Sequence, residues 1–171
     1  SERSNKQDIK IVSLIKSKRY MNQFYLVVEL LRQRLQANPN VNTVVLSKTD
    51  DKDLYKKSIY PLVQINPVSA PMSSSHVSYF TFEVAALDQR DISKSAIKDK
   101  FEGNDNLQDN LNITYTILND LVNWLRLQNN TYGIELSSVT DATPILFSDF
   151  NILDGWYMSI TLMVPNNQSV C

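Results

Sequence analysis

Two stretches of alternating apolar residues constrain the fold of this chain more than any other feature. They are Val77–Asp88 (VSYFTFEVAALD) and, near the C-terminus, Trp156–Val164 (WYMSITLMV). Successive side chains of a β-strand point to opposite faces of its sheet, so each stretch is predicted to be a strand with one apolar face. The predicted apolar positions are Phe80, Phe82, Val84 and Ala86 in the first strand, and Trp156, Met158, Ile160, Leu162 and Val164 in the second.

Two amphipathic helices are predicted to cover these apolar faces. Residues 19–37 carry apolar side chains at three- and four-residue spacing, and Asn38-Pro39 follows as a stop. Residues 106–129 form the stronger pattern, with Asp105 or Asn106 as a possible cap and an end near Gly133. This second helix has two apolar faces. One would pack on the sheet, and the other on the first helix or on a neighbouring subunit.

Four further stretches are strand candidates: 41–47, 60–66, 134–138 and 142–148. Pro61 cannot donate a ladder hydrogen bond, which places it at a strand start or on an edge. Residues 67–75 are predicted to be a loop that joins 60–66 and 77–88 as an antiparallel pair. The fold class predicted for residues 1–171 is therefore one α+β domain, a two-layer sandwich with a mainly antiparallel sheet and helices on one face.

Two segments fall outside this core pattern. Residues 1–18 are mostly polar with apolar residues interleaved, and are expected to be a flexible or partner-bound arm. Residues 88–106 carry both charge signs and few apolar side chains. A connection of this length inside a compact domain is usually functional or disordered, so it is interpreted as a long charged loop or an assembly arm.

The composition excludes several classes of function. A net charge of −1 and a pI near 5.8 argue against a dedicated nucleic-acid binder. Three glycines, one histidine (His76) and one cysteine (Cys171) leave no phosphate loop, zinc pattern or internal disulfide. No apolar run reaches the roughly 18 residues of a membrane span, and the first residues, SERSNKQDIK, are unlike a secretory signal. We therefore expect no catalytic residues, no cofactor and no metal.

Clustered carboxylates are the one feature that could indicate an enzyme. Asp50, Asp51 and Asp53 lie close together in the sequence, as do Asp149 and Asp154. Paired carboxylates can hold a divalent cation or perform acid–base chemistry. Aspartate is also common in turns, which is the simpler interpretation. An aspartate-dependent metal hydrolase remains the enzyme alternative.

A resemblance adds to this account. The phrases YPLVQINP, YFTFEVAALDQRD, DNLQDNLNITYTILNDLVNWL and LFSDFNILDGWYMSITLMVPN, with the closing cysteine, span about residues 58–171. Together they resemble virion structural proteins of tailed bacteriophages, especially phages of Bacteroidetes hosts including crAss-like ones. Within these, the chain is similar to tail-terminator and tail-completion proteins of the neck.

The resemblance implies a non-enzymatic ring protein at the head-to-tail junction of a virion assembled in the host bacterial cytoplasm. The expected partners are further copies in a six- or twelve-fold ring and portal, head-closure or tail-tube proteins, with DNA passing transiently through the lumen and no membrane. A head-closure or portal-adaptor protein is the alternative, ranked lower because adaptors are usually mostly helical. The candidate assembly interface comprises Arg90, Asp91, Lys94, Lys98, Lys100, Glu102 and Trp124.

Overall fold

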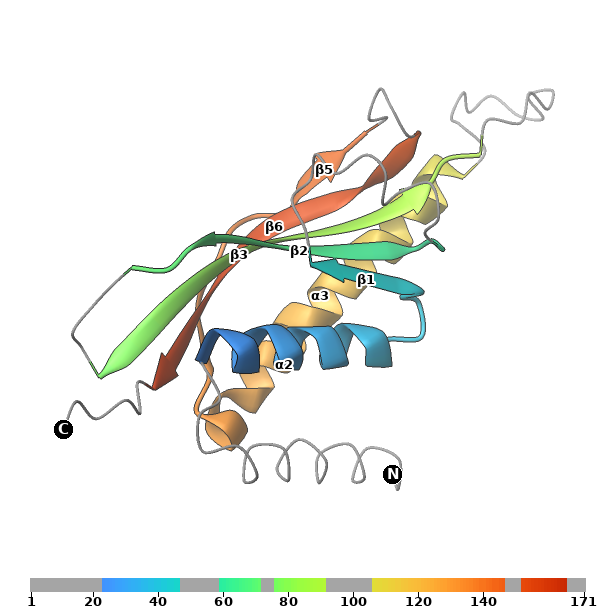
Figure 1. The fold of residues 1–171 in the computed structure, drawn as a ribbon. Helices are drawn as coiled ribbons and strands as arrows, with labels where there is room; N and C mark the ends of the chain where they lie inside the picture. Colours follow the sequence, from blue (N-terminus) through green and yellow to red (C-terminus); the bar gives the residue numbers. More distant parts are fainter. Residues whose placement is uncertain (1–22, 47–58, 72–75, 92–105, 147–151, 166–171) are drawn as a thin grey trace, which may run out of the picture.

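The computed structural model describes residues 23–46, 59–71, 76–91, 106–146 and 152–165 (Figure 1). A helix, three strands, a second helix and three strands follow one another along the chain. The elements are α2 (Gln23–Ala37), β1 (Thr43–Leu46), β2 (Leu62–Ser69), β3 (Val77–Gln89), α3 (Leu107–Tyr132), β4 (Glu135–Val139), β5 (Thr143–Ile145) and β6 (Leu153–Pro165).

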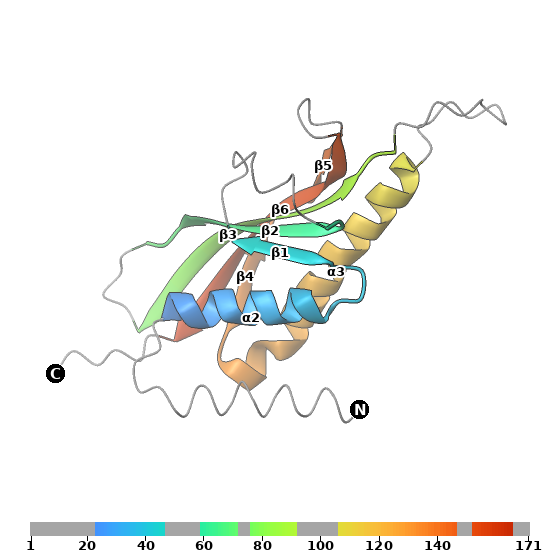
Figure 2. The same ribbon diagram turned by 45° about the vertical axis from the view of Figure 1, so that its right-hand side comes forward.

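The six strands form one sheet, which runs in the order β1-β2-β3-β6-β4 with β5 also paired to β6 (Figure 2). All pairings are antiparallel except β1 with β2, which is parallel. Strands β3 and β6 are the centre of the sheet and pair along their whole length, from Val77 opposite Pro165 to Gln89 opposite Leu153. The two predicted alternating stretches are therefore direct neighbours.

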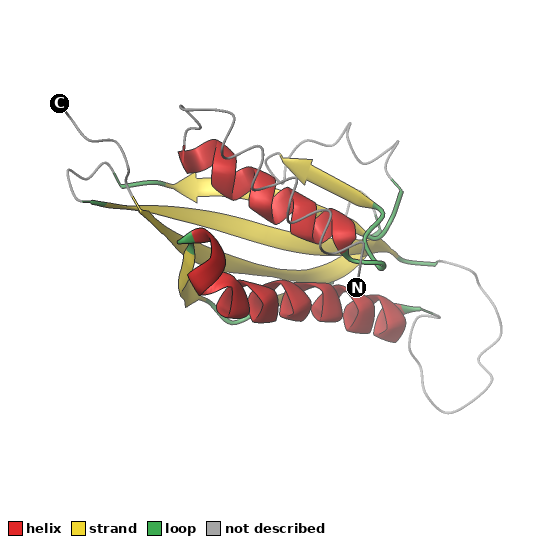
Figure 3. Ribbon diagram, turned by 90° about the horizontal axis from the view of Figure 1, so that it is seen from below, coloured by secondary structure: helices red, strands yellow, loops and turns green. Residues whose placement is uncertain are grey.

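Both helices lie on the same face of the sheet (Figure 3). The predicted α+β class, with a mainly antiparallel sheet and helices packed on it, is confirmed. The main core lies between the two layers and takes Val27, Leu31 and Leu35 from α2 and Ile117 and Leu121 from α3. The sheet contributes Val63, Ile65, Phe82, Val84, Ala86, Met158, Ile160, Leu162 and Val164 to this core.

The alternation in the two central strands explains why the helices pack where they do. Phe82 faces Ile160 across the strand pair, and Val84 faces Met158, so the apolar sets of β3 and β6 share one face. Residues Thr81 and Thr161 occupy the intervening positions and join their hydroxyl groups at 3.0 Å on the opposite face. A smaller apolar cluster of Leu62, Leu87 and Leu153 also lies apart from the main core.

Two predicted strand boundaries were wrong. Strand β2 does not stop at Asn66 but continues through Pro67 to Ser69, where a register shift interrupts its pairing with β3. Strand β6 begins at Leu153, so Gly155 lies inside it. A methyl group at Gly155 would overlap the carbonyl oxygen of Ala86. Glycine here permits a close backbone approach, a use of glycine that a sequence pattern easily mistakes for a turn.

The two ends of α3 are formed in different ways. Gly133 has φ +66° and ends the helix in the left-handed conformation that favours glycine. Asn106 occupies the cap position, but its side chain makes no capping hydrogen bond, and the other predicted cap, Asp105, lies outside the described residues. The side chain of Asn106 is instead engaged with the end of β3, as described below.

Candidate assembly surface

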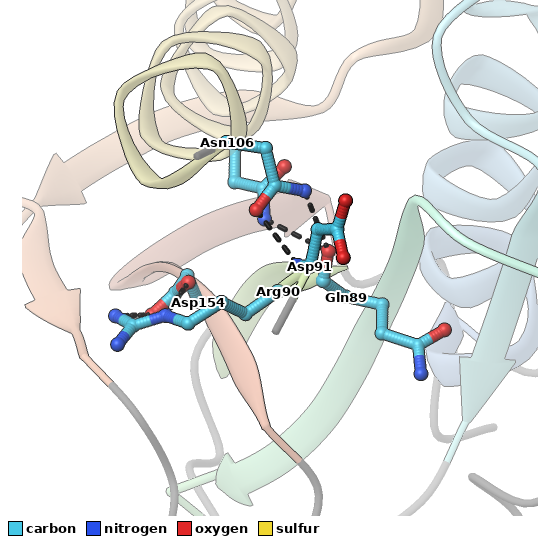
Figure 4. Close-up of polar contacts among 6 residues, drawn as sticks. Gln89, Arg90, Asp91, Asn106 and Asp154 are labelled. Carbon is cyan, nitrogen blue, oxygen red and sulfur yellow. Dashed lines mark hydrogen bonds and ion pairs between the residues drawn. The ribbon is translucent and has the colours of Figure 1, made fainter. Parts of the chain in front are cut away.

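The end of the sheet beside the N-terminus of α3 carries a buried ion pair. Asp88 of β3 lies opposite Asp154 of β6, and Arg90 follows directly after β3. The Nε of Arg90 donates to Oδ2 of Asp154 at 2.7 Å, and its Nη2 donates to Oδ1 (Figure 4). This two-pronged geometry is the strongest form of an arginine–carboxylate contact. The pair therefore ties the end of β3 to the start of β6.

Burial makes this pair costly to break. The side chain of Asp154 is 0% exposed and that of Arg90 is 9% exposed. Removing two charges from water is expensive, and the mutual attraction offsets that cost only when both partners are present. Asp154 therefore acts in this structure as an ion-pair partner of Arg90. Its proposed partner in a hydrolase site, Asp149, lies outside the described residues.

Two asparagines at the start of α3 are hydrogen-bonded to the end of β3. The side chain of Asn106 accepts a hydrogen bond from the backbone N–H of Asp91 at 2.8 Å and donates to the carbonyl oxygen of Gln89 at 3.1 Å (Figure 4). Asn110, one turn further along α3, donates to the same carbonyl oxygen at 3.0 Å. The end of β3 is thus fastened both to β6 and to the first turn of α3.

This arrangement fixes the two points between which residues 92–105 are inserted. Asp91 and Asn106 are fifteen positions apart in the sequence, yet their backbone and side chain are hydrogen-bonded. The described residues on either side of 92–105 therefore meet at one corner of the domain. We call the set Gln89, Arg90, Asp91, Asn106, Asn110 and Asp154 the corner clamp.

Asp88 is a second carboxylate beside the corner clamp. Partial burial raises the pKa of Asp88, the hydrogen bond from the backbone N–H of Gln89 lowers it, and the negative charge of Asp154 raises it further. Burial is the largest of these effects. The ionised form of Asp88 is consequently less favourable in the folded protein than in water.

The residues predicted as an assembly interface are placed unequally. Arg90 points inward to Asp154, while the side chain of Asp91 is exposed at the start of the charged segment. Lys94, Lys98, Lys100 and Glu102 lie outside the described residues. The role of these residues in an assembly interface stays a prediction. Arg90 belongs to the ion pair beside the point where residues 92–105 are inserted.

Trp124 lies where α3 meets α2. It is half-buried against the main core, and the guanidinium of Arg34 lies 5.4 Å from the centroid of its ring. Arg34 also pairs with Asp120 at 2.8 Å, and Asn38 donates to the same carboxylate at 3.2 Å. The first helix therefore contacts this part of α3, and a contact with a neighbouring subunit stays a prediction.

Sequence reasoning missed the corner clamp, although a signal for it was present. Arg90 and Asp154 continue the even-numbered series of β3 and β6 that carries the apolar core residues. Opposite charges in phase with a buried face, at the adjoining ends of two neighbouring strands, indicate a buried pair. No comparable signal marks Asn106 and Asn110, because their partners are backbone groups far away in the sequence.

A shallow groove of about 200 Å³ lies between α3 and the connection of β4 to β5. Its floor includes Leu118 and Met158, and its rim carries Arg126 and Asp141. The groove offers one positive and one negative group above an apolar floor.

No group of three or more His, Cys, Asp or Glu side chains is close enough to hold a metal ion among the described residues. Within the same part of the chain, no helix has the length and apolar character required to cross a membrane.

Comparisons with known proteins give no family assignment. No protein-family model matches the sequence, and no curated protein matches it significantly.

Proposed function

We propose that this chain is a structural subunit that assembles with copies of itself into a ring at the head-to-tail junction of a tailed bacteriophage. The observation that carries the proposal is the corner clamp. A buried ion pair and three asparagine hydrogen bonds hold the base of a charged segment. A rigid support for an inserted segment suits a contact with a partner.

A ring requires two different surfaces on each subunit, one for each neighbour. The domain offers such asymmetry. The corner clamp, where residues 92–105 are inserted, lies at the end of the sheet, whereas β1 and β4 lie at opposite edges of that sheet. In the proposed assembly, the 92–105 segment of one subunit contacts the next subunit or an adjacent ring.

The proposed environment is the virion, with portal, head-closure or tail-tube proteins as neighbours and DNA passing through the lumen. The near-neutral net charge of −1 supports a conduit. A strongly basic lumen would bind phosphates and slow the passage of DNA. A head-closure or portal-adaptor role in the same particle is the alternative, and the six-stranded sheet favours it less than the terminator role.

Replacing residues 92–105 with a short Gly-Ser linker tests the proposal. Because Asp91 and Asn106 are hydrogen-bonded, a short linker can close the gap without pulling on the sheet. We expect a folded monomer with unchanged far-ultraviolet circular dichroism and no ring. The matched control carries the same fourteen residues in shuffled order, which preserves length and charge but not the contact sequence.

Three results distinguish the possibilities in this experiment. Loss of assembly with the linker and with the shuffled segment supports a sequence-specific contact. Rings that form equally well with the linker would refute the role of 92–105. Unfolding with the linker would show that the segment belongs to the core, which also contradicts the proposed role.

A further inference from the structure

Strand β1 leaves two of its residues with backbone groups pointing away from the sheet. The N–H of Thr43 donates to the carbonyl oxygen of Pro61 at 3.3 Å, so Thr43 faces β2. Backbone groups alternate in direction along a strand, which turns those of Val44 and Leu46 outward. Among the described residues, no hydrogen bond is formed on this outer side of β1.

The other border stretches of the sheet carry features that discourage the addition of a strand. Strand β2 has Pro67 and a register shift where it extends beyond β1, β4 has a register shift between Leu136 and Ser138, and β5 contains Pro144. Prolines and bulges are standard protection of a sheet edge. Strand β1, with the sequence TVVL, has neither a proline nor a bulge nor a charge.

The side chain at the end of β1 adds to this contrast. Leu46 is 52% exposed, whereas Val44 packs against the main core and Val45 against the smaller cluster. An apolar side chain beside unpaired backbone groups is suited to a partner that adds a strand to an edge.

We propose that the β1 edge binds the N-terminal segment of a neighbouring copy as an added strand. The binding stretch is Ile9–Ile15 (IKIVSLI), which is rich in β-branched residues and flanked by Lys16. The contact deepens the proposed ring and rests on it, because it supplies the link from one subunit to the next.

Charge complementarity supports this occupant. Residues 1–22 contain six basic and two acidic side chains, a net charge of +4. The described residues contain four basic and nine acidic side chains, a net charge of −5. Opposite potentials on two surfaces favour and steer their association.

Length and symmetry also agree with an exchanged segment. The 22 residues that precede α2 could span about 70 Å if fully extended, enough to reach an adjacent subunit. A segment of one copy on the β1 edge of the next is a heterologous contact, which gives a ring when the rotation between subunits closes and an open filament when it does not. Pairing of β1 with β1 of a second copy would be a two-fold contact and would give a dimer.

Two substitutions at one position separate the backbone from the side chain. Leu46→Pro removes the outward N–H of β1 in the full-length protein, and Leu46→Ala removes most of the exposed side chain but keeps the N–H. Because Leu46 is exposed and ends the strand, both variants should fold. We expect Leu46→Pro to weaken assembly at least tenfold in a dilution series followed by light scattering, and Leu46→Ala to weaken it less. Equal assembly of Leu46→Pro and wild type would overturn the inference while the ring proposal stands.

A cross-link identifies the occupant. In a Cys171→Ser background, an Ile11→Cys chain is mixed with a Leu46→Cys chain under mild oxidation, and a Lys6→Cys chain replaces the first as a position outside the binding stretch. We expect covalent dimers between Ile11→Cys and Leu46→Cys, and fewer with Lys6→Cys. A single chain that carries both Ile11→Cys and Leu46→Cys is oxidised alongside this mixture. No cross-link between the mixed chains, or a cross-link that forms only within the doubly substituted chain, would refute the exchange. If the wild type never assembles, the ring proposal itself fails, which dilution of the unmodified protein shows separately.

Discussion

The Arg90–Asp154 pair joins two opposite charges where almost no water reaches them. Its importance for stability is the loss of unfolding free energy when one partner alone is removed. Asp154→Ala leaves the guanidinium buried without its carboxylate, and we expect the free energy of unfolding to fall by about 3–5 kcal/mol in urea titrations. The double variant Arg90→Met/Asp154→Leu replaces both charges with apolar groups and should recover a large part of this loss. Equal destabilisation in the single and double variants would contradict an ion-pair role.

Asp88 gives a prediction for pH dependence. Burial raises its pKa in the folded state, so the folded protein binds this proton more tightly than the unfolded chain. As pH rises from the ordinary aspartate value of about 3.9 through the raised folded value, the unfolding free energy therefore loses the contribution of Asp88.

The substitution Asp88→Asn removes the group that titrates, so this pH-dependent loss of unfolding free energy disappears. The asparagine keeps an oxygen that can accept the hydrogen bond of the Gln89 N–H. The variant should melt at a higher temperature than wild type at pH 7, and the difference should shrink as pH approaches 4. Thermal unfolding across this pH range measures it. A variant less stable than wild type at pH 7 would show that the charge of Asp88 is favourable.

At the scale of elements, neighbouring residues of β3 have opposite roles. Phe82 is buried between the sheet and the helices, and Phe24 stacks on it with ring centroids 6.0 Å apart. Phe82→Ala should cost about 3–5 kcal/mol of unfolding free energy. Thr81→Ala, on the opposite face, loses one hydroxyl pair and should cost about 1 kcal/mol. Similar costs in chemical denaturation would contradict the assignment of faces.

The same strands show how far sequence reasoning reaches. Period-two alternation is a local property of the chain, so the apolar faces of β3 and β6 were predictable residue by residue. The direction of β1 was not, because a parallel and an antiparallel neighbour have the same alternation. The predicted strands ended before Pro67 and began after Gly155, since the place of these two residues inside strands depends on an edge position and on the backbone of Ala86. The corner clamp joins Arg90 and Asp154, which are 64 positions apart and which no local pattern connects.

At the scale of the whole molecule, charge is divided between the described domain and the segments around it. The domain is acidic and the N-terminal segment is basic, although the chain as a whole is nearly neutral. Such a division favours contact between different parts of different copies. In the proposed assembly, the corner clamp and the β1 edge would provide two structural supports, one at the end of the sheet and one at its side.

The mass of the full-length protein in solution tests the central claim most directly. Native mass spectrometry over a range of concentrations should show a closed species of six or twelve times the 19.6 kDa chain, with few intermediates because a ring is complete only when closed. A single species at 19.6 kDa at every concentration, in the presence and absence of portal or tail-tube protein, would contradict the ring.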